Sequence, residues 1–271
     1  MFAFFLKKNF CDGWDNLFLL AFTNIITALL VVGLYFGAKY ADSVNPYLGG
    51  AFVVFSMAVF MSLAFAIGAN SARIAGFGKA SLPLFFQSLK IVWKTGFAFG
   101  LCLALALLVC RYAVIYYLSL YFSGGNLIGL AMAAFLLWMI LFALVALQWF
   151  IPLYFLQENN GFKKCFKKSF IIFFDNAGFS FLVFIYNIVL FVLSCPFFTI
   201  LPGVSGIVLS SMNALRLRLY KYDWIEKMSE SDPSFESNRD KRNEVPWDEL
   251  LFDDKEALGP RKLISFIMPW K

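Results

Sequence analysis

Side chains that could carry out chemistry are scarce in this sequence and do not form a catalytic or metal-binding set. The 271 residues include no histidine, which is the commonest general base and metal ligand in proteins. The acids of the first 215 positions lie outside the long apolar stretches, which argues against paired-aspartate catalysis within a membrane. They are Asp12, Asp15, Asp42, Glu158 and Asp175. No phosphate- or dinucleotide-binding loop is present, and the five cysteines show no CxxC spacing. The sequence predicts a protein that is not an enzyme and needs no metal or other cofactor.

Besides several serines and threonines, four polar side chains lie well inside the apolar stretches. They are Asn24, Arg111, Gln148 and Asn187. An ionisable group within a membrane is by default a functional candidate. Arg111 is therefore either a substrate or gating charge, or a long side chain that reaches the aqueous interface among the tyrosines that follow it. The three amides either form hydrogen bonds between helices or line a path for a solute.

An Asn-x-x-Arg pattern closes two of the apolar stretches. It places Asn70 with Arg73 and Asn213 with Arg216. In the simpler interpretation, each arginine satisfies the terminal carbonyl groups of a helix and interacts with the helix dipole. In the alternative, Arg73 and Arg216 line one site for an anion or a partner protein.

The composition indicates which elements must position these residues. Hydrophobic residues make up 61% of the chain and charged residues only 15%, whereas a soluble domain carries about 25% charged residues. Six apolar stretches are long enough to cross about 30 Å of hydrocarbon as helices. They cover residues 17–38, 47–69, 96–120, 127–155, 177–195 and 196–215. The fourth must tilt or end at Pro152, and the start of the sixth is either a tight turn or a broken helix.

Lysine and arginine gather at alternate ends of these stretches. Up to residue 221, thirteen lie before the first stretch, after the sixth, or in the second and fourth connections, whereas Lys39 and Arg111 alone lie toward the other side. Because basic residues mark the cytoplasmic side, the sequence predicts a multi-pass protein of the inner (cytoplasmic) cell membrane with both termini in the cytoplasm.

Three similar segments precede the odd-numbered stretches. KKNFCDGWDN at 7–16 matches KKSFIIFFDN at 167–176, and SLKIVWKT at 88–95 matches more weakly. Amphipathic helices of this kind lie in the headgroup plane, with their lysines toward anionic lipid. We therefore expect three repeats of an interfacial amphipathic helix followed by a two-helix hairpin. The interfacial side chains of these segments are Trp14, Trp93 and Phe174.

A ridge of small residues marks the third stretch. Gly96, Gly100 and Ala104 recur at four-residue spacing, which lets two helix backbones approach closely. In a six-helix bundle we expect this ridge to pack against another helix of the same chain rather than against a second copy.

The last fifty residues differ from the rest. We divide the chain into a membrane domain, 1–222, and a cytoplasmic tail, 223–271. Residues 227–242 are charged and poor in aliphatic side chains, which is typical of a flexible linker. The segment 245–271 carries many apolar side chains, among them Trp247, Phe266 and Trp270. We expect it to dock on the cytoplasmic face of its own bundle, on the membrane surface or on another protein, and we favour the basic loops of the bundle around 73–94 and 163–168.

Residues 1–220 resemble the YesL group of bacterial membrane proteins. The resemblance rests on the pattern F-x-x-x-x-F-x-x-x-x-D/K-N-x-h ahead of an apolar stretch, in segments 5–20, 85–100 and 166–182, and on PFFTILPG at 196–203. It implies an accessory protein of the bacterial inner membrane, since some members of that group accompany sugar ABC transporters.

Two functional hypotheses follow for an all-α membrane protein with six transmembrane helices. The first is a non-enzymatic accessory or scaffold protein that contacts anionic lipid and a protein partner, with no role in binding nucleic acid. The alternative is a channel or transporter for a small solute, which would require a continuous polar path through the bundle.

Overall fold

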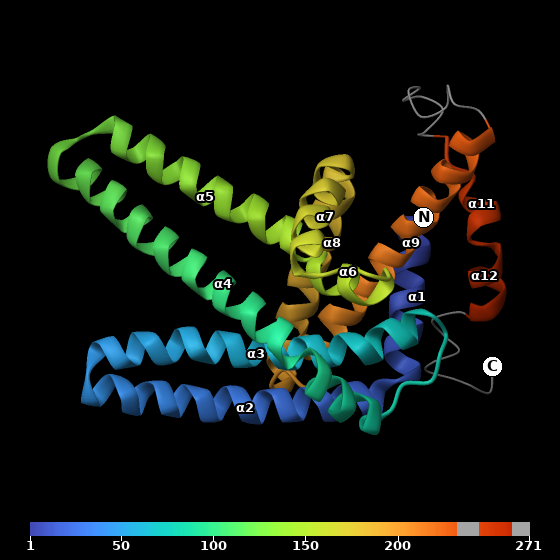
Figure 1. Cartoon of the computed structure of the whole chain (residues 1–271), viewed down its shortest axis with the longest axis horizontal. Coiled ribbons are helices and arrows are strands. Elements are labelled where there is room, and N and C mark those ends of the chain that lie inside the picture. The colour runs from blue at the N-terminus through green and yellow to red at the C-terminus, as the bar shows by residue number, and fades with distance from the viewer. Residues whose placement is uncertain (232–243, 262–271) are drawn as a thin grey trace.

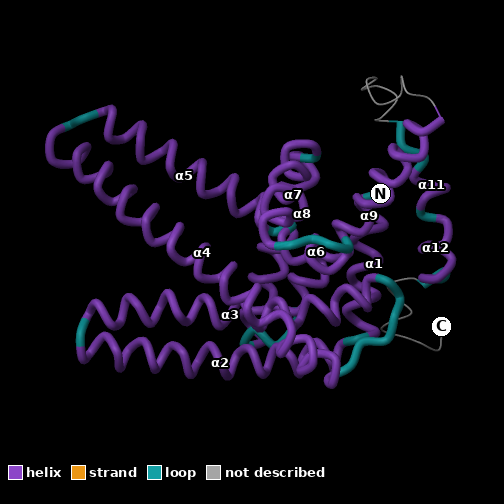
Figure 2. Tube along the Cα trace, in the orientation of Figure 1, coloured by secondary structure: helices purple, strands orange, loops and turns teal. Residues whose placement is uncertain are grey.

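The structure, a computed structural model, describes residues 1–231 and 244–261. Over these two ranges the chain forms helices and loops only (Figures 1 and 2), as predicted. The first six helices are α1 Phe2–Asp15, α2 Leu17–Val44, α3 Pro46–Ala75, α4 Leu82–Gly124, α5 Leu127–Leu147 and α6 Phe150–Leu156. They are followed by α7 Phe162–Asp175, α8 Ala177–Ser194, the 3-10 turn η1 Cys195–Phe197, α9 Gly203–Ser231, α11 Trp247–Leu250 and α12 Phe252–Leu258.

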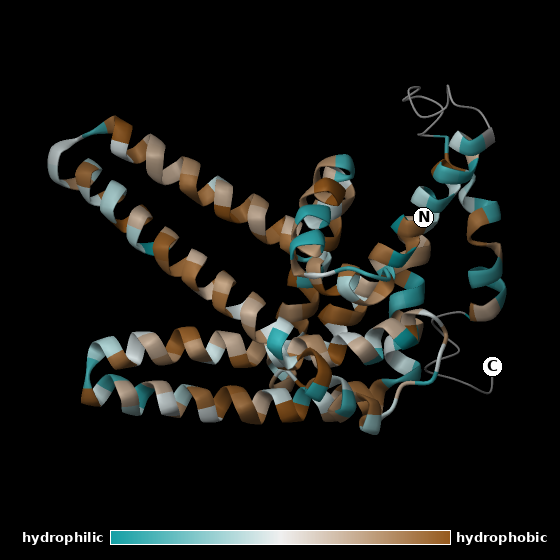
Figure 3. Ribbon diagram, in the orientation of Figure 1, coloured by the Kyte–Doolittle hydropathy of each residue, from teal (hydrophilic) through white to brown (hydrophobic). Residues whose placement is uncertain are grey.

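Five segments of the described chain are long and apolar enough to cross a membrane: α2, α3, α4, α5 with α6, and α8 with η1. Figure 3 shows them as long, mostly hydrophobic ribbons. Their outer surfaces are apolar as well, since Phe18, Leu29 and Phe36 of α2 are 88%, 69% and 65% exposed. Apolar surface on this scale is not stable in water, and it identifies a multi-pass membrane protein.

Local sequence signals build the two long hairpins. Asn45 caps α3 by accepting a hydrogen bond from the Tyr47 amide at 2.8 Å, with Pro46 in the first turn. Gly125 ends α4 in the left-handed region at φ 66°, and Asn126 caps α5 through the Ile128 amide at 3.0 Å. These short connections place α2 beside α3 and α4 beside α5, and the second hairpin diverges from the first toward the turns (Figure 1).

The joints before the first and fifth stretches are alike. α1 and α7 each have 14 residues and end at an Asp-Asn pair, Asp15-Asn16 and Asp175-Asn176. Each asparagine side chain donates back to a carbonyl of the helix that it follows, Asn16 to Asp12 at 2.9 Å and Asn176 to Ile172 at 3.5 Å. This local bond breaks the helix between the amphipathic segment and the apolar one.

The second repeat departs from this arrangement. Lys94-Thr95-Gly96 stand where the other repeats have their joint, and the helix continues through them, so the amphipathic segment and the third stretch form one helix of 43 residues, α4. A helix of this length measures about 65 Å, so it extends well beyond a bilayer core. The predicted separate interfacial helix is therefore wrong for this repeat.

The predicted sixth stretch, 196–215, becomes a turn followed by a longer helix. Phe198 and Thr199 adopt left-handed φ values of 51° and 61°, and α9 begins only at Gly203. α9 is not one of the five candidate spans of the described chain. It is surrounded by α1, α2, α3, α6 and α8, which explains why buried serines are tolerated along it. Of the two alternatives left open by the sequence, the tight turn is the one observed.

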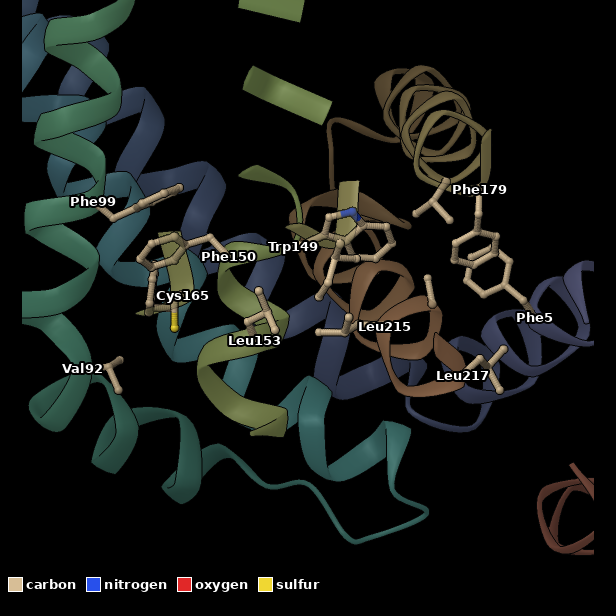
Figure 4. Packing of buried hydrophobic residues seen from close by; sticks show 14 of the residues in the cluster. Phe5, Val92, Phe99, Trp149, Phe150, Leu153, Cys165, Phe179, Leu215 and Leu217 are labelled. Carbon is tan, nitrogen blue, oxygen red and sulfur yellow. The ribbon is translucent and has the colours of Figure 1, made fainter. Parts of the chain in front are cut away.

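The main core forms where the two hairpins meet α6 and α9 (Figure 4). α5 ends at Leu147 and the chain bends at Gln148-Trp149, so the fourth stretch breaks before Pro152, which lies in the first turn of α6. Proline is tolerated there because its missing N–H would have no helical partner. The buried Trp149 indole donates to Ser180 Oγ at 3.1 Å, and the Phe150 ring stacks on Phe99 at 4.3 Å between centroids.

The ridge of small residues packs within the chain, as predicted, because Gly96, Gly100 and Ala104 are buried where α4 meets α3. A Cβ on Gly100 would lie 2.7 Å from Cα of Ala58. We expect Gly100→Ala to lower the free energy of unfolding by about 1–3 kcal/mol, as in other overpacked sites. Gly33→Ala is the control, since nothing lies within 4 Å of its added carbon. Thermal unfolding in detergent measures both, and equal shifts would contradict the close approach of α3 and α4.

Candidate functional site

Asn24 of α2 binds the turn between α8 and α9. Its amide nitrogen donates to the carbonyls of Ile200 at 2.9 Å and Pro202 at 2.8 Å, and its oxygen accepts from the Ser205 amide at 2.8 Å. Gly203 is required beside it, since its φ is +59° and a Cβ would lie 2.5 Å from the Asn24 amide nitrogen. Asn24 therefore serves as an interhelical hydrogen-bonding residue, the simpler of its two interpretations.

Gln148 and Asn187 line one cavity of about 340 Å³. Its walls come from α3, α4, α5, α6, α8 and α9 and are apolar apart from these two amides and Ser211. Gln148 donates to the carbonyls of Val145 at 2.8 Å and Ser180 at 2.9 Å, and Asn187 donates to Ser211 Oγ at 3.1 Å. Both amide oxygens are buried and accept no hydrogen bond from any described residue. They are the polar acceptors of an otherwise apolar cavity.

Arg111 does not join this pair. It is exposed on α4, about 20 Å from the helix end at Gly124 at 1.5 Å per residue, and it is not one of the residues that line the cavity. The four polar side chains within the apolar stretches therefore lie at three separate places and do not follow one path.

The two Asn-x-x-Arg motifs reach the same end of α3 from different helices. Asn70 pairs with the Ser81 backbone, donating to its carbonyl at 3.0 Å and accepting from its amide at 3.1 Å. Arg73 is exposed in the last turn of α3. Arg216 of α9 is half-buried and donates to the carbonyl of Ala75. Arg216 thus satisfies a terminal carbonyl, as the simpler interpretation requires, but that of α3 and not of its own helix.

A buried ion pair of α1 faces α9. Lys8 is fully buried and Asp12 is 6% exposed, and their Nζ and Oδ2 atoms are 3.0 Å apart. Asn213 donates to the same Asp12 oxygen at 3.0 Å and to Asn9 Oδ1 at 3.2 Å. Burial lowers the pKa of Lys8 and raises the pKa of Asp12, because each charged form loses its hydration. Through the hydrogen bond from Asn213, the pair holds the amphipathic α1 against α9.

A second ion pair joins this one through Phe77. The Lys8 Nζ lies 3.6 Å from the centroid of the Phe77 ring, and the Arg216 guanidinium carbon lies 5.4 Å from it. Arg216 Nη2 donates to Asp254 Oδ1 of α12 at 3.0 Å, and the hydroxyl of Tyr220 donates to the same oxygen at 3.1 Å. We call Lys8, Asp12, Arg216 and Asp254 the charge cluster, in which two cations face two anions.

The tail docks on α1 and α9 through this cluster. Asp254, Leu251 and Leu258 are 4%, 1% and 4% exposed, and Trp247 packs against the main core with Arg218 6.0 Å from its ring centroid. In the described part of the tail, the ion pairs with the bundle go to Arg216 and Asp15. The predicted receiving surface, the lysines of the two basic loops, is therefore wrong for these residues. Phe266 and Trp270 lie outside the described residues.

The predicted interfacial residues are all exposed: Trp14 by 48%, Trp93 by 47% and Phe174 by 74%. Lys8, Asp12 and Asp254 are site residues that were not predicted from the sequence. The first two are four residues apart on an amphipathic helix, a spacing that permits an ion pair. Nothing in the sequence distinguishes Asp254 from the other acids of the tail.

Comparisons with protein-family models, with curated proteins and with solved structures find no match to this chain. Among the described residues, no group of three His, Cys, Asp or Glu side chains lies close enough together to hold a metal ion. Function has to be inferred from the docked tail, the charge cluster and the cavities.

Proposed function

We propose that this protein is a non-enzymatic accessory or scaffold protein of the bacterial inner membrane whose tail engages a cytoplasmic protein. The docked tail is the observation that supports this role. It is held by one buried ion pair, Asp254 with Arg216 at 3.0 Å, and by a few apolar side chains such as Leu251 and Leu258. A contact within one chain is an equilibrium that a partner can shift by binding the released tail better than the docked one, so the tail can exchange its own bundle for another protein.

The pairing of the buried charged side chains with one another supports a role without catalysis. Lys8, Asp12, Arg216 and Asp254 compensate one another inside the charge cluster, where they join the tail, α1 and α9. The resemblance of residues 1–220 to the YesL group stays a prediction, and it points to a membrane transport system as the kind of partner.

Photo-crosslinking in cells tests the role of the tail. A photoreactive amino acid is placed at Leu258, which faces the bundle, in the natural chain and in Asp254→Asn. We expect mainly internal links in the natural chain, and an adduct with one recurring protein when the ion pair is broken. The same probe at the exposed Phe55 of α3 is the control. A variant whose tail is released but forms no adduct beyond this control would contradict the proposal.

We also propose that both ends of the described chain face the cytoplasm. α1 and the tail touch, with Arg261 paired to Asp15 and Lys7 donating to the Gly259 carbonyl at 3.5 Å, so they lie on one side of the membrane. This requires a sixth crossing, which we assign to α9, packed beside α8 inside the bundle. The excess of basic residues favours the cytoplasm for that side.

In a cysteine-free background, new cysteines at Ser43 and Ser123 should react with an impermeant thiol reagent in intact cells, and one at Asp253 should not. Labelling at Asp253 from outside would reverse the orientation.

The cavity at Gln148 and Asn187 favours the alternative, a channel or transporter for a small solute. Its two amide oxygens could receive donors of a solute. Asn187→Leu should then abolish uptake into vesicles that contain the purified protein and leave its folding intact. Arg111 and Asn24 lie away from this cavity, which is why we place the accessory role first.

A further inference from the structure

A groove runs along α1 on the side that faces α8. It consists of two cavities of about 510 and 340 Å³ that share the side chains of Phe10 and Tyr186. The α1 side chains that border it recur at three- and four-residue spacing, from Ala3 through Leu6, Lys7 and Phe10 to Trp14, so one stripe of the helix forms one wall. α8 contributes the other wall with Tyr186, Leu190, Leu193 and, in η1, Phe197.

The two ends of the groove differ in polarity. Lys7 and Arg261 border the first cavity. The second is apolar apart from Asn9 and Tyr186, which bond to each other at 3.1 Å, and it extends between α2 and α9 to Leu20 and Leu209. Phe10 and Trp14 stack at 6.1 Å between centroids and are 40% and 48% exposed. The groove thus leads from a basic mouth, past aromatic side chains, to an apolar end beside the start of the first candidate span.

We infer that this groove binds one anionic phospholipid, with the phosphate at Lys7 and Arg261 and an acyl chain in the apolar cavity. Both cations have exposed contacts, Lys7 with the Gly259 carbonyl at 3.5 Å and Arg261 with Asp15, and each keeps further N–H donors for a phosphate. Aromatic side chains such as Trp14 favour the interface between headgroups and chains. The apolar end can hold an acyl chain, and no cation lines it that would bind a free phosphate ion.

The binding of lipid would also fix α1, since the bound molecule would contact α1, α8 and the tail residue Arg261. This inference depends on insertion into a bilayer and not on the proposed partner of the tail, so the two can fail separately.

Native mass spectrometry of the delipidated full chain in detergent tests the inference, with phosphatidylglycerol, phosphatidylcholine and inorganic phosphate as probes. We expect one phosphatidylglycerol to bind at least about fivefold more tightly than phosphatidylcholine, the effect of one basic side chain at a membrane surface. Lys7→Gln should remove most of that preference. Equal binding of the two lipids, or displacement of phosphatidylglycerol by millimolar phosphate, would overturn the assignment.

Filling the apolar end separates this site from lipid bound elsewhere on the bundle. Gly13 borders the second cavity, and nothing lies within 4 Å of a Cβ added there. Gly13→Leu should weaken phosphatidylglycerol binding at least about tenfold, because each methylene kept out of the cavity costs about fourfold. Gly33→Leu, a matched change on the exposed surface of α2, should bind as the natural chain does. If Gly13→Leu does not fold, Leu193→Trp narrows the same cavity from α8. If either variant folds and still binds phosphatidylglycerol as tightly as the natural chain, the site is refuted.

Discussion

Asparagine in place of Asp254 should release α12 from the bundle and leave the membrane domain folded. The carboxylate is 4% exposed and accepts hydrogen bonds from Arg216 at 3.0 Å and Tyr220 at 3.1 Å. Asparagine keeps the size of the side chain but removes the charge that the half-buried guanidinium faces. Arg216 keeps its hydrogen bond to the Ala75 carbonyl. We therefore expect the free energy of docking to weaken by about 2 kcal/mol, as for other hydrogen bonds to charged groups.

Limited proteolysis of the purified full chain measures this release. Cleavage within residues 244–261 should become about thirtyfold faster, because proteolysis follows the population of the released state when docking is rapid. Asp253→Asn is the matched control, since it makes the same chemical change at the exposed neighbouring position. If both variants are cut at the rate of the natural chain, the Asp254–Arg216 pair does not hold the tail.

The lengths of the apolar stretches predicted five of the long helices, and the two similar amphipathic segments predicted α1 and α7. The turns between the long helices also have local causes. The Asn-Pro pair before α3 and the Gly-Gly-Asn sequence before α5 fix the turns of the two hairpins through local caps. α9 could not be placed in the same way. Its first residues are apolar enough to suggest a span, yet they are largely buried among other helices of the chain, and a burial of that kind depends on residues far away in the sequence.

The docking surface of the tail could not be predicted from the number of basic residues in each loop. The basic loops 73–94 and 163–168 offered the larger positive field, but exposed lysines in water contribute little to a contact. Docking follows a single partly buried partner, Arg216, together with apolar contacts at Leu251 and Leu258. Sequence alone indicated that the segment around Trp247 docks, and the receiving surface depends on which charges the fold buries.

The buried pair of α1 leads to the second large effect. Lys8→Ala should lower the free energy of unfolding by about 3–5 kcal/mol, the usual result of removing one member of a buried ion pair. Asp12 would keep one hydrogen bond, from Asn213 at 3.0 Å, but would lose its counter-charge at 6% exposure. The Phe77 ring would also lose the ammonium group that lies 3.6 Å from its centroid.

A double variant distinguishes a charge effect from the simple loss of side-chain volume. Burial disfavours the charged forms of both partners, lowering the pKa of Lys8 and raising the pKa of Asp12, so the intact pair should add little net stability over a neutral pair of similar size. Lys8→Met combined with Asp12→Asn removes both charges and keeps an oxygen that can accept from Asn213. We expect it to recover more than half of the stability lost in Lys8→Ala. Lys167→Ala removes an exposed lysine of α7, in the segment that matches the one containing Lys8, and should shift stability by less than about 0.5 kcal/mol. Denaturant unfolding in detergent compares the four proteins. A double variant no more stable than Lys8→Ala would mean that the ion pair itself, and not the avoidance of a lone buried charge, holds α1 on α9.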